Sequence, residues 1–363
     1  SACPPLPRSP SRLARPLLDP VAIDARLDAV EWFCERRPLR QKLRETLRGM
    51  GDMARALSRL ALGRGGPRDL GCLRDGLAGG ETISELFSHP APLDPPPPGE
   101  IAGALAGLHP LSDPNLAEFR RLLTEGLGQD LPAQARDGGY VAAGVRVELD
   151  QARALRDDSR KVILQLEARL AAESGVALKI KHNAVLGYFV ETSAKAAEPL
   201  MTPPLNATFI HRQTLANQVR FTTVELAELD ARIAQAAERA LAMEVATFEA
   251  WREAAIAVAT AIQAAAEGAS RLDVAAGLAE WSDDVGASRP VVDRSTAFEA
   301  EAARHPVVEA AVKRAGNPFT PNDCRLDGAG VVGARLSIVT GPNMAGKSTF
   351  LRQNALLAVL AQA

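Results

Sequence analysis

Residues 341–349 read Gly341-Pro342-Asn343-Met344-Ala345-Gly346-Lys347-Ser348-Thr349, and this stretch decides the fold of the region around it. It fits the pattern G-x-x-x-x-G-K-[ST], in which the backbone amides of a glycine-bounded loop surround the phosphates of a nucleotide. Residues 335–340 before it read as a buried strand, and residues 347–362 after it carry apolar side chains at helical spacing. Strand, loop and helix therefore follow in the order that a phosphate-binding loop requires. A chance glycine-rich turn before a helix is the less favoured interpretation.

The residue types of this loop suit a nucleotide triphosphate, ATP or GTP. Gly341 and Gly346 permit backbone dihedrals that other residues resist, and the free amides at a helix N-terminus attract phosphate oxygens. We expect Lys347 to reach the β- and γ-phosphates and Ser348 to bind the Mg²⁺ ion that bridges them. Because the loop lies close to the end of the chain, we expect a fragment that lacks the downstream acid and the water-orienting group of a nucleotidase. Alone, the chain should then be inactive.

Composition limits the class of protein. The 363 residues suffice for two or three domains, and 42 basic against 44 acidic residues leave any polyanion site to be local. The four cysteines lack C-x-x-C spacing, which argues against a zinc site and favours a reducing cytoplasm. Apolar runs are too short to span a bilayer, which predicts no membrane partner. Residues 1–16, rich in proline and arginine, are expected to be disordered.

Helical periodicity dominates the rest of the chain. Residues 17–172 carry several apolar stripes, the last of them on a helix that ends at Ser174-Gly175. A further stripe runs from Thr223 to Gly268, which predicts one helix on the order of 65 Å long at 1.5 Å per residue. Stripes of this length indicate helices that pack against each other as arms.

Between the two arms, residues 173–225 have a sequence pattern that predicts a small sheet. Four short segments, 178–181, 188–192, 209–212 and 218–221, are predicted to be strands. Basic residues outnumber acidic ones in this module, which suits a phosphate backbone, although ordinary solvated strand faces explain the charge about as well. The candidate DNA contacts are Lys179, Lys181, Asn183, Arg212, Asn217 and Arg220.

Several segments together resemble the MutS family of DNA mismatch repair proteins. The loop 340–349 carries a Pro-Asn-Met insertion that is narrower than the general pattern, and Arg304-His305-Pro306-Val307-Val308-Glu309 precedes it. Residues 183–189 and 212–217 are similar to the clamp of that family. Residues 24–30 and 67–70 are similar to its helical core. The resemblance extends over nearly all of the chain from residue 17.

The resemblance implies a multidomain, mainly α fold. Helical core and lever segments would occupy residues 17–172 and 226–284, a β-rich DNA clamp 173–225, and the truncated start of an α/β P-loop ATPase domain 285–363. The family further implies ATP and Mg²⁺ as cofactors, a homodimer around mismatched duplex DNA, mismatch-repair partner proteins and a bacterial-type, DNA-associated protein. Phe319 would stack on adenine, with Asn322 in the same segment, and Asn343 would face a phosphate. For Phe319, a plain core role stays open.

The chain also departs from the family. Ala345 stands where many members carry Gly, and the mismatch-reading domain with its Phe-x-Glu wedge is absent. Phe33-Cys34-Glu35 fits that short pattern, but it lies in a helical stripe, so we reject it as a mismatch reader. Two alternatives remain: a non-catalytic helical clamp or scaffold in which residues 285–363 are poorly ordered, and another coiled-coil P-loop ATPase. Coiled-coil P-loop ATPases of the latter kind usually have their nucleotide loop near the N-terminus, whereas the loop here follows the helical arm, which disfavours that alternative.

Overall fold

The computed structural model of the chain describes residues 10–88, 95–108, 113–183, 185–329, 334–342 and 346–363. Its contacts divide the chain into two compact units, each considered separately below. The first unit contains residues 1–59, 72–120 and 258–363, and the second contains residues 60–71 and 121–257. The predicted architecture, mainly helical with a small sheet inserted between two helices, is confirmed.

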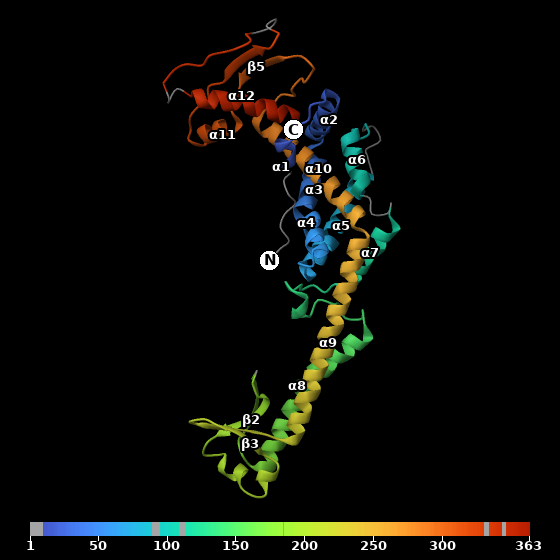
Figure 1. The fold of residues 1–363 in the computed structure, drawn as a ribbon, viewed down its shortest axis with the longest axis vertical. Helices are drawn as coiled ribbons and strands as arrows, with labels where there is room; N and C mark the ends of the chain where they lie inside the picture. Colours follow the sequence, from blue (N-terminus) through green and yellow to red (C-terminus); the bar gives the residue numbers. More distant parts are fainter. Residues whose placement is uncertain (1–9, 89–94, 109–112, 184, 330–333, 343–345) are drawn as a thin grey trace. The chain divides into compact units, whose positions relative to one another are not determined.

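Helices form most of the first unit (Figure 1). Its elements are α1 (Pro10–Ala14), α2 (Pro20–Glu35), α3 (Arg37–Gly49), α6 (Gly99–Leu108), α10 (Ala259–Val285), β5 (Ala297–Ala303), α11 (Pro306–Arg314), β6 (Asn322–Asp327) and α12 (Lys347–Gln362). Three more helices contribute residues to both units: α4 (Met53–Ala61), α5 (Pro67–Ser88) and α7 (Pro114–Gly126). No helix among the described residues has the length and apolar character needed to cross a membrane.

Helix α10 is the centre of the first unit, where it packs against α6, α2 and α3. Its buried positions are mostly alanine, so neighbouring backbones approach closely. A Cβ atom placed on Gly268 would lie 2.4 Å from the carbonyl oxygen of Ala104 in α6, and only glycine fits there. In the same unit, Phe33 is fully buried and packs edge-on against Trp32 and Phe87, which confirms that it is a core residue.

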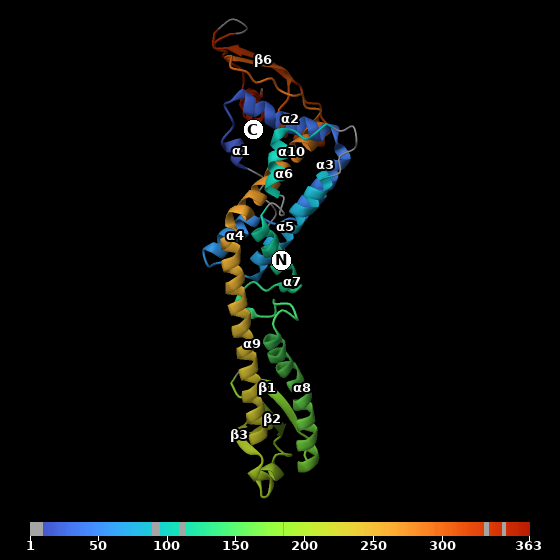
Figure 2. The same ribbon diagram turned by 90° about the vertical axis from the view of Figure 1, so that its right-hand side faces the viewer.

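The second unit is an antiparallel helix pair with a sheet at its end (Figure 2). Helices α8 (Val147–Ser174) and α9 (Val224–Ala257) pack side by side. The sheet has the order β1-β2-β4-β3, with every neighbouring pair antiparallel. Its strands are β1 (Lys179–Asn183), β2 (Gly187–Ser193), β4 (Gln218–Thr222) and β3 (Ile210–Thr214), close to the four predicted segments.

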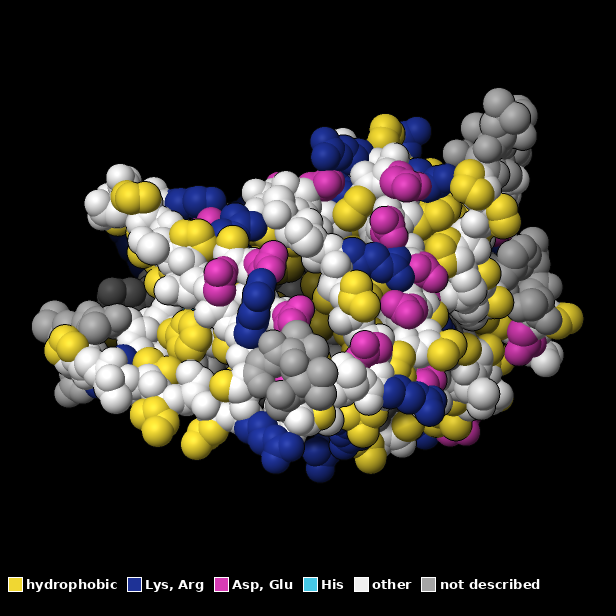
Figure 3. Space-filling model, turned by 90° about the horizontal axis from the view of Figure 1, so that it is seen from above, with side chains coloured by type: hydrophobic (Ala, Val, Ile, Leu, Met, Phe, Trp, Pro, Cys, Tyr) yellow, Lys and Arg dark blue, Asp and Glu magenta, His cyan; other side chains and the backbone are white. Residues whose placement is uncertain are grey.

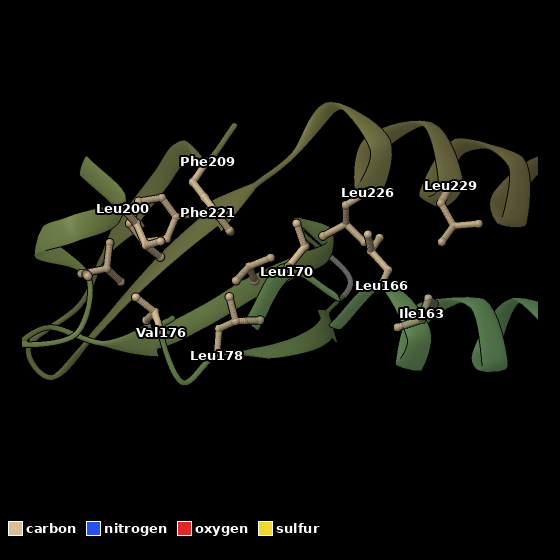
Figure 4. Packing of buried hydrophobic residues seen from close by; sticks show 13 residues of the cluster. Ile163, Leu166, Leu170, Val176, Leu178, Leu200, Phe209, Phe221, Leu226 and Leu229 are labelled. Atoms are coloured by element: carbon tan, nitrogen blue, oxygen red, sulfur yellow. The ribbon is translucent and has the colours of Figure 1, made fainter. Parts of the chain in front are cut away.

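One hydrophobic cluster joins this sheet to the two helices (Figure 4). Val190, Val219 and Phe221 project from the inner face of the sheet and are at most 2% exposed. Ile163 and Leu166 of α8 meet Leu226 and Leu229 of α9 at the other end of the cluster. Alternation along the strands thus places most apolar side chains on this face, while the opposite face carries polar side chains around the buried Phe189.

Two predicted elements differ in the structure. The stripe from Thr223 to Gly268 does not form one helix, because the backbone leaves helical geometry at Val258 (φ −104°, ψ 20°) between α9 and α10. Neither glycine nor proline marks this break, so the periodicity runs through it. The short apolar segment Tyr140–Ala142, which follows the turn Asp137-Gly138-Gly139 and is predicted from its residue types to be a strand, forms only a single bridge, between Val141 and Leu127.

The strand predicted at residues 335–340 is also wrong, since this segment has no strand geometry. Only Ala334 pairs, in an isolated parallel bridge with Leu326 of β6. Leu336 and Ile338 remain 77% and 80% exposed. The physical reason is that a strand of a parallel sheet needs a continuous hydrogen-bonding partner and cover on both faces, and the described residues supply one bridge.

Candidate nucleotide loop and nucleic-acid interface

The start of α12 has the backbone geometry of an anion site. Gly346 is the N-cap residue, with φ 82° and ψ 7°, and no side chain caps the helix. A Cβ atom at Gly346 would meet nothing within 4 Å, so the left-handed backbone and not crowding calls for glycine. Gly341 likewise has a positive φ of 141°. Uncapped amides in the first turn, with the helix dipole behind them, favour a phosphate oxygen.

The side chains of the loop lie around this helix start. The Lys347 ammonium donates to the carbonyl oxygen of Gly341, so it lies across the loop. Ser348 and Pro342 are exposed, and Thr349 is half-buried. The predicted phosphate neighbours at 343–345 (Asn343, Met344 and Ala345) lie outside the described residues.

Phe319 precedes β6, and Asn322 is the first residue of that strand. Phe319 is half-buried in the segment before the strand, and the Asn322 side-chain amide donates to the carbonyl oxygen of Thr320 at 3.1 Å. Within the described ranges, no hydrogen bond joins either residue to the loop at 341–349. Their role in adenine binding therefore stays a prediction.

The segment 304–309 connects the end of α10 to α11. Arg304 donates to the carbonyl oxygens of Val285 (2.8 Å) and Gly286 (3.1 Å), at the C-terminus of α10. Its guanidinium also contacts the buried carboxylate of Glu309 at 3.1 Å. The hydrogen bond from the Lys313 ammonium holds the pKa of Glu309 below its usual value. An arginine at this position satisfies helix carbonyls that would otherwise lack donors.

On the outer face of the four-stranded sheet, Glu191 contacts two of the predicted basic residues, and the sequence alone did not point to it. Strand register aligns Lys179, Glu191, Arg220 and Gln213 in one row across the sheet. Glu191 is only 6% exposed. Its carboxylate accepts from the Lys181 ammonium (2.6 Å) and from Arg220 Nε (3.1 Å). Chiefly because of the hydrogen bond from Lys181, the pKa of Glu191 lies below its usual value.

Arg220 is held from three directions. Besides its contact with Glu191, its Nη1 donates to the Gln213 side chain at 3.0 Å, and its guanidinium lies 4.6 Å from the centre of the buried Phe189 ring. Its side chain is 21% exposed, whereas that of Lys181 is 54% exposed. Arg220 is therefore a buried counterion more than a surface cation.

The other predicted DNA contacts lie apart from this pair. Lys179 contacts Glu167 of α8 at 3.0 Å, and the Asn183 side chain accepts from two backbone amides of the β1–β2 turn. Arg212 and Asn217 are exposed, in β3 and in the β3–β4 turn. Antiparallel register places Asn183 and Asn217 at opposite ends of the sheet. The structure thus joins Lys181 and Arg220 through one carboxylate, places Lys179 in the same row of the sheet, and separates Asn183 from Asn217.

The first unit offers no comparable feature on the face shown in Figure 3. There, lysine and arginine side chains lie among aspartate and glutamate side chains. No group of three or more His, Cys, Asp or Glu side chains within the described ranges could hold a metal ion.

Comparison with known proteins gives a consistent result. A family model described as MutS domain III matches residues 10–279, and one described as MutS domain V matches residues 337–363. Proteins named DNA mismatch repair protein MutS from Caulobacter sp. (strain K31) and Caulobacter vibrioides are each 72% identical to the chain. The protein of that name from Rhodopseudomonas palustris (strain HaA2) is 52% identical. These alignments cover 97% of this chain and 38–39% of each relative, so the chain spans about two fifths of their length.

Proposed function

Because the chain belongs to the MutS family of DNA mismatch repair proteins, we propose that it grips duplex DNA through its four-stranded sheet and binds ATP with Mg²⁺ at residues 341–349. The observation that carries the nucleotide part is the uncapped, glycine-led start of α12, inside the region that resembles MutS domain V. The sheet at the end of the α8–α9 pair, inside the region that resembles domain III, carries the DNA part.

The residues present fit a nucleotide triphosphate. First-turn amides of α12 would hold phosphate oxygens, and Lys347 would exchange its bond to the Gly341 carbonyl for one to the β- and γ-phosphates. The exposed Ser348 hydroxyl would bind Mg²⁺, with Asn343 beside the phosphates and Phe319 and Asn322 near the adenine. ATP bound there would supply free energy for a change in how the protein holds DNA.

The sheet would hold the sugar-phosphate backbone and not base edges. Its outer face carries polar and basic side chains around the ring of Phe189, while most of its other apolar side chains point into the cluster with α8 and α9. Contacts of this kind give sequence-independent, salt-sensitive affinity. We propose that in the whole protein two such chains form a dimer around mismatched DNA, together with other repair proteins, in the bacterial cytoplasm.

A second candidate is a clamp and scaffold without nucleotide binding. The exposure of Leu336 and Ile338, in a segment that forms no strand, favours it, because the loop at 341–349 then lacks the rigid strand that should precede it. The two candidates differ in whether the chain retains a fluorescent ATP analogue.

The test measures both ligands on the same chain. Anisotropy of a labelled duplex, between about 50 and 200 mM salt, reports DNA binding, and a fluorescent ATP analogue with Mg²⁺ reports nucleotide binding. We expect Lys347→Ala to abolish nucleotide binding and to leave duplex binding intact. Arg352→Ala, on an exposed position of the same helix, is the control that keeps both. Duplex binding without nucleotide binding in the wild type would favour the scaffold, and loss of both would refute the proposal.

A further inference from the structure

We infer that residues 286–296, the segment between α10 and β5, form a strap that Arg289 holds closed against one face of α2, and that screening of its ion pairs opens the strap. The inference goes beyond the proposed function, since the strap needs neither DNA nor nucleotide. Helices α2 and α10, strand β5 and the strap all belong to the first unit. The strap follows the region that resembles MutS domain III and precedes the nucleotide loop.

Helix α2 presents a row of acidic side chains. Asp24, Asp28 and Glu31 follow one another at spacings of four and three residues, which places them on one face of the helix. Their side chains are 54%, 53% and 57% exposed. Because like charges at this spacing destabilise a helix, the row favours a cation beside it.

Arg289 of the strap supplies that cation. Its Nη1 donates to the Glu31 carboxylate at 2.6 Å, and its Nη2 lies 2.7 Å from a carboxylate oxygen of Asp28 and 3.5 Å from one of Asp24. Nη2 also donates to the backbone carbonyl oxygen of Asp24 at 3.4 Å. One guanidinium thus spans about two turns of α2. A planar guanidinium that several partners hold keeps its geometry better than an isolated surface pair does.

Little besides Arg289 holds the strap to α2. The strap has neither helix nor strand geometry, and its apolar side chains are half-buried or exposed. Among the described residues, no backbone-to-backbone hydrogen bond joins it to α2. A second ion pair, between Arg294 and Asp19, is 4.0 Å long and joins two exposed side chains. The closed position of the strap therefore depends chiefly on the contacts of Arg289.

The two ends of this connection are held in different ways. Beyond β5, Arg304 donates to two carbonyl oxygens at the end of α10 and contacts the buried Glu309, so salt screens this anchor less. The carboxylates that hold Arg289 are more than half exposed, so salt weakens their pairs more. Arg289 is thus the anchor that ionic conditions can release, and its release frees β5 to move relative to α2.

Trypsin cleavage after Arg294 reports on the opening of the strap. This bond lies inside the strap, and a protease cleaves it only when the residues on both sides can extend into its active site. Position 289 is followed by Pro290, and trypsin does not cleave such a bond, so a substitution at 289 removes no cleavage site. The rate is read from the fragment that begins at Ser295, under conditions of a single cleavage per chain.

Arg289→Gln should speed this cleavage about tenfold, which corresponds to about 1.4 kcal/mol spread over three exposed pairs. The double variant Asp28→Asn, Glu31→Gln should speed it somewhat less, because the contacts with Asp24 remain. Adding these two substitutions to Arg289→Gln should give no further increase, since all three remove the same pairs. Salt should speed cleavage of the wild type, normalised to an unstructured peptide substrate, much more than cleavage of Arg289→Gln. Arg48→Gln, on an exposed position of α3, is the control that leaves the rate unchanged.

Three results would overturn the inference. In the first, Arg289→Gln is cleaved at the wild-type rate, or the substitutions on α2 and at position 289 multiply each other's effects. In the second, the wild-type rate does not respond to salt, so screening does not open the strap. In the third, amide exchange throughout α2 and α10 rises in Arg289→Gln, which would mean that the residue acts through folding of the whole unit; we expect this exchange to match the wild type.

Discussion

Replacement of Arg220 by alanine should destabilise the sheet far more than replacement of Lys181, although both side chains contact the same carboxylate. Glu191 is 6% exposed, and it keeps the Lys181 ammonium when Arg220 is replaced and the Arg220 guanidinium when Lys181 is replaced. Arg220→Ala removes a charged hydrogen bond worth about 1.5–3 kcal/mol and the guanidinium that covers Phe189, worth about 0.5–1 kcal/mol. With Lys181 as a remaining partner, we expect a net cost of about 2–3 kcal/mol. Lys181→Ala removes a half-exposed partner and should cost at most about 1 kcal/mol.

The assay must report on the sheet alone, because the chain consists of two units that need not unfold together. Hydrogen exchange of the amides that pair β2 with β4 meets this need, since local opening sets their rate. At 1.4 kcal/mol per tenfold change, Arg220→Ala should raise these rates about 30- to 140-fold. Lys181→Ala should raise them about fivefold at most.

Equal effects of the two substitutions would refute this reasoning, because the argument depends on the difference in burial between the two cations. So would a variant Arg220→Ala with exchange rates like those of the wild type. Either result would mean that the carboxylate of Glu191 is solvated well enough to do without the half-buried Arg220 as its counterion.

Three further predictions concern pH, turn geometry and a helix end. The folded-state pKa of Glu191 lies below its usual value of about 4.3, so its stabilising contribution is present above that value and is lost as the pH falls through the lower pKa. Exchange of the sheet amides, corrected for intrinsic rate, should therefore rise below about pH 4. Glu191→Gln should remove this pH-dependent rise. Gly187 and Gly175 share a φ of +66°, but a Cβ atom at Gly187 would lie 2.1 Å from a carboxylate oxygen of Asp230, whereas one at Gly175 meets nothing within 4 Å. Gly175→Ala should therefore lower the free energy of unfolding by about 1–2 kcal/mol, and Gly187→Ala should lower it clearly more. Equal losses would contradict the contact with Asp230. Arg304→Gln should speed amide exchange in the last turn of α10 about tenfold, since that turn loses its cap, and an unchanged rate would show that the Gly286 turn suffices.

Parts of this fold could be predicted because they depend on neighbouring residues alone. The four strands of the second unit follow from alternation over a few residues, and helix α8 follows from its apolar stripe and the glycine at its end. The break at Val258 could not be predicted in this way. A valine disfavours a helix only weakly, and the apolar spacing continues on both sides of it.

The same distinction applies to the candidate site. The nucleotide loop is recognisable from its two glycines, its lysine and the hydroxyl residues that follow, because their chemistry is local. Residues 335–340 have the composition of a strand, yet a strand forms only when partners complete its hydrogen bonds, and those partners are remote in sequence.

The sequence alone is enough to identify the family, a candidate phosphate-binding loop and a small sheet rich in basic residues between two helical segments. Tertiary structure decided which of those basic residues are available to a polyanion. Lys181 meets its carboxylate ten residues away, Arg220 meets the same carboxylate 29 residues away, and Lys179 meets Glu167 at a separation of 12. Such pairings arise from strand register and helix packing, and an ion pair depends on distances of a few ångströms that composition does not specify.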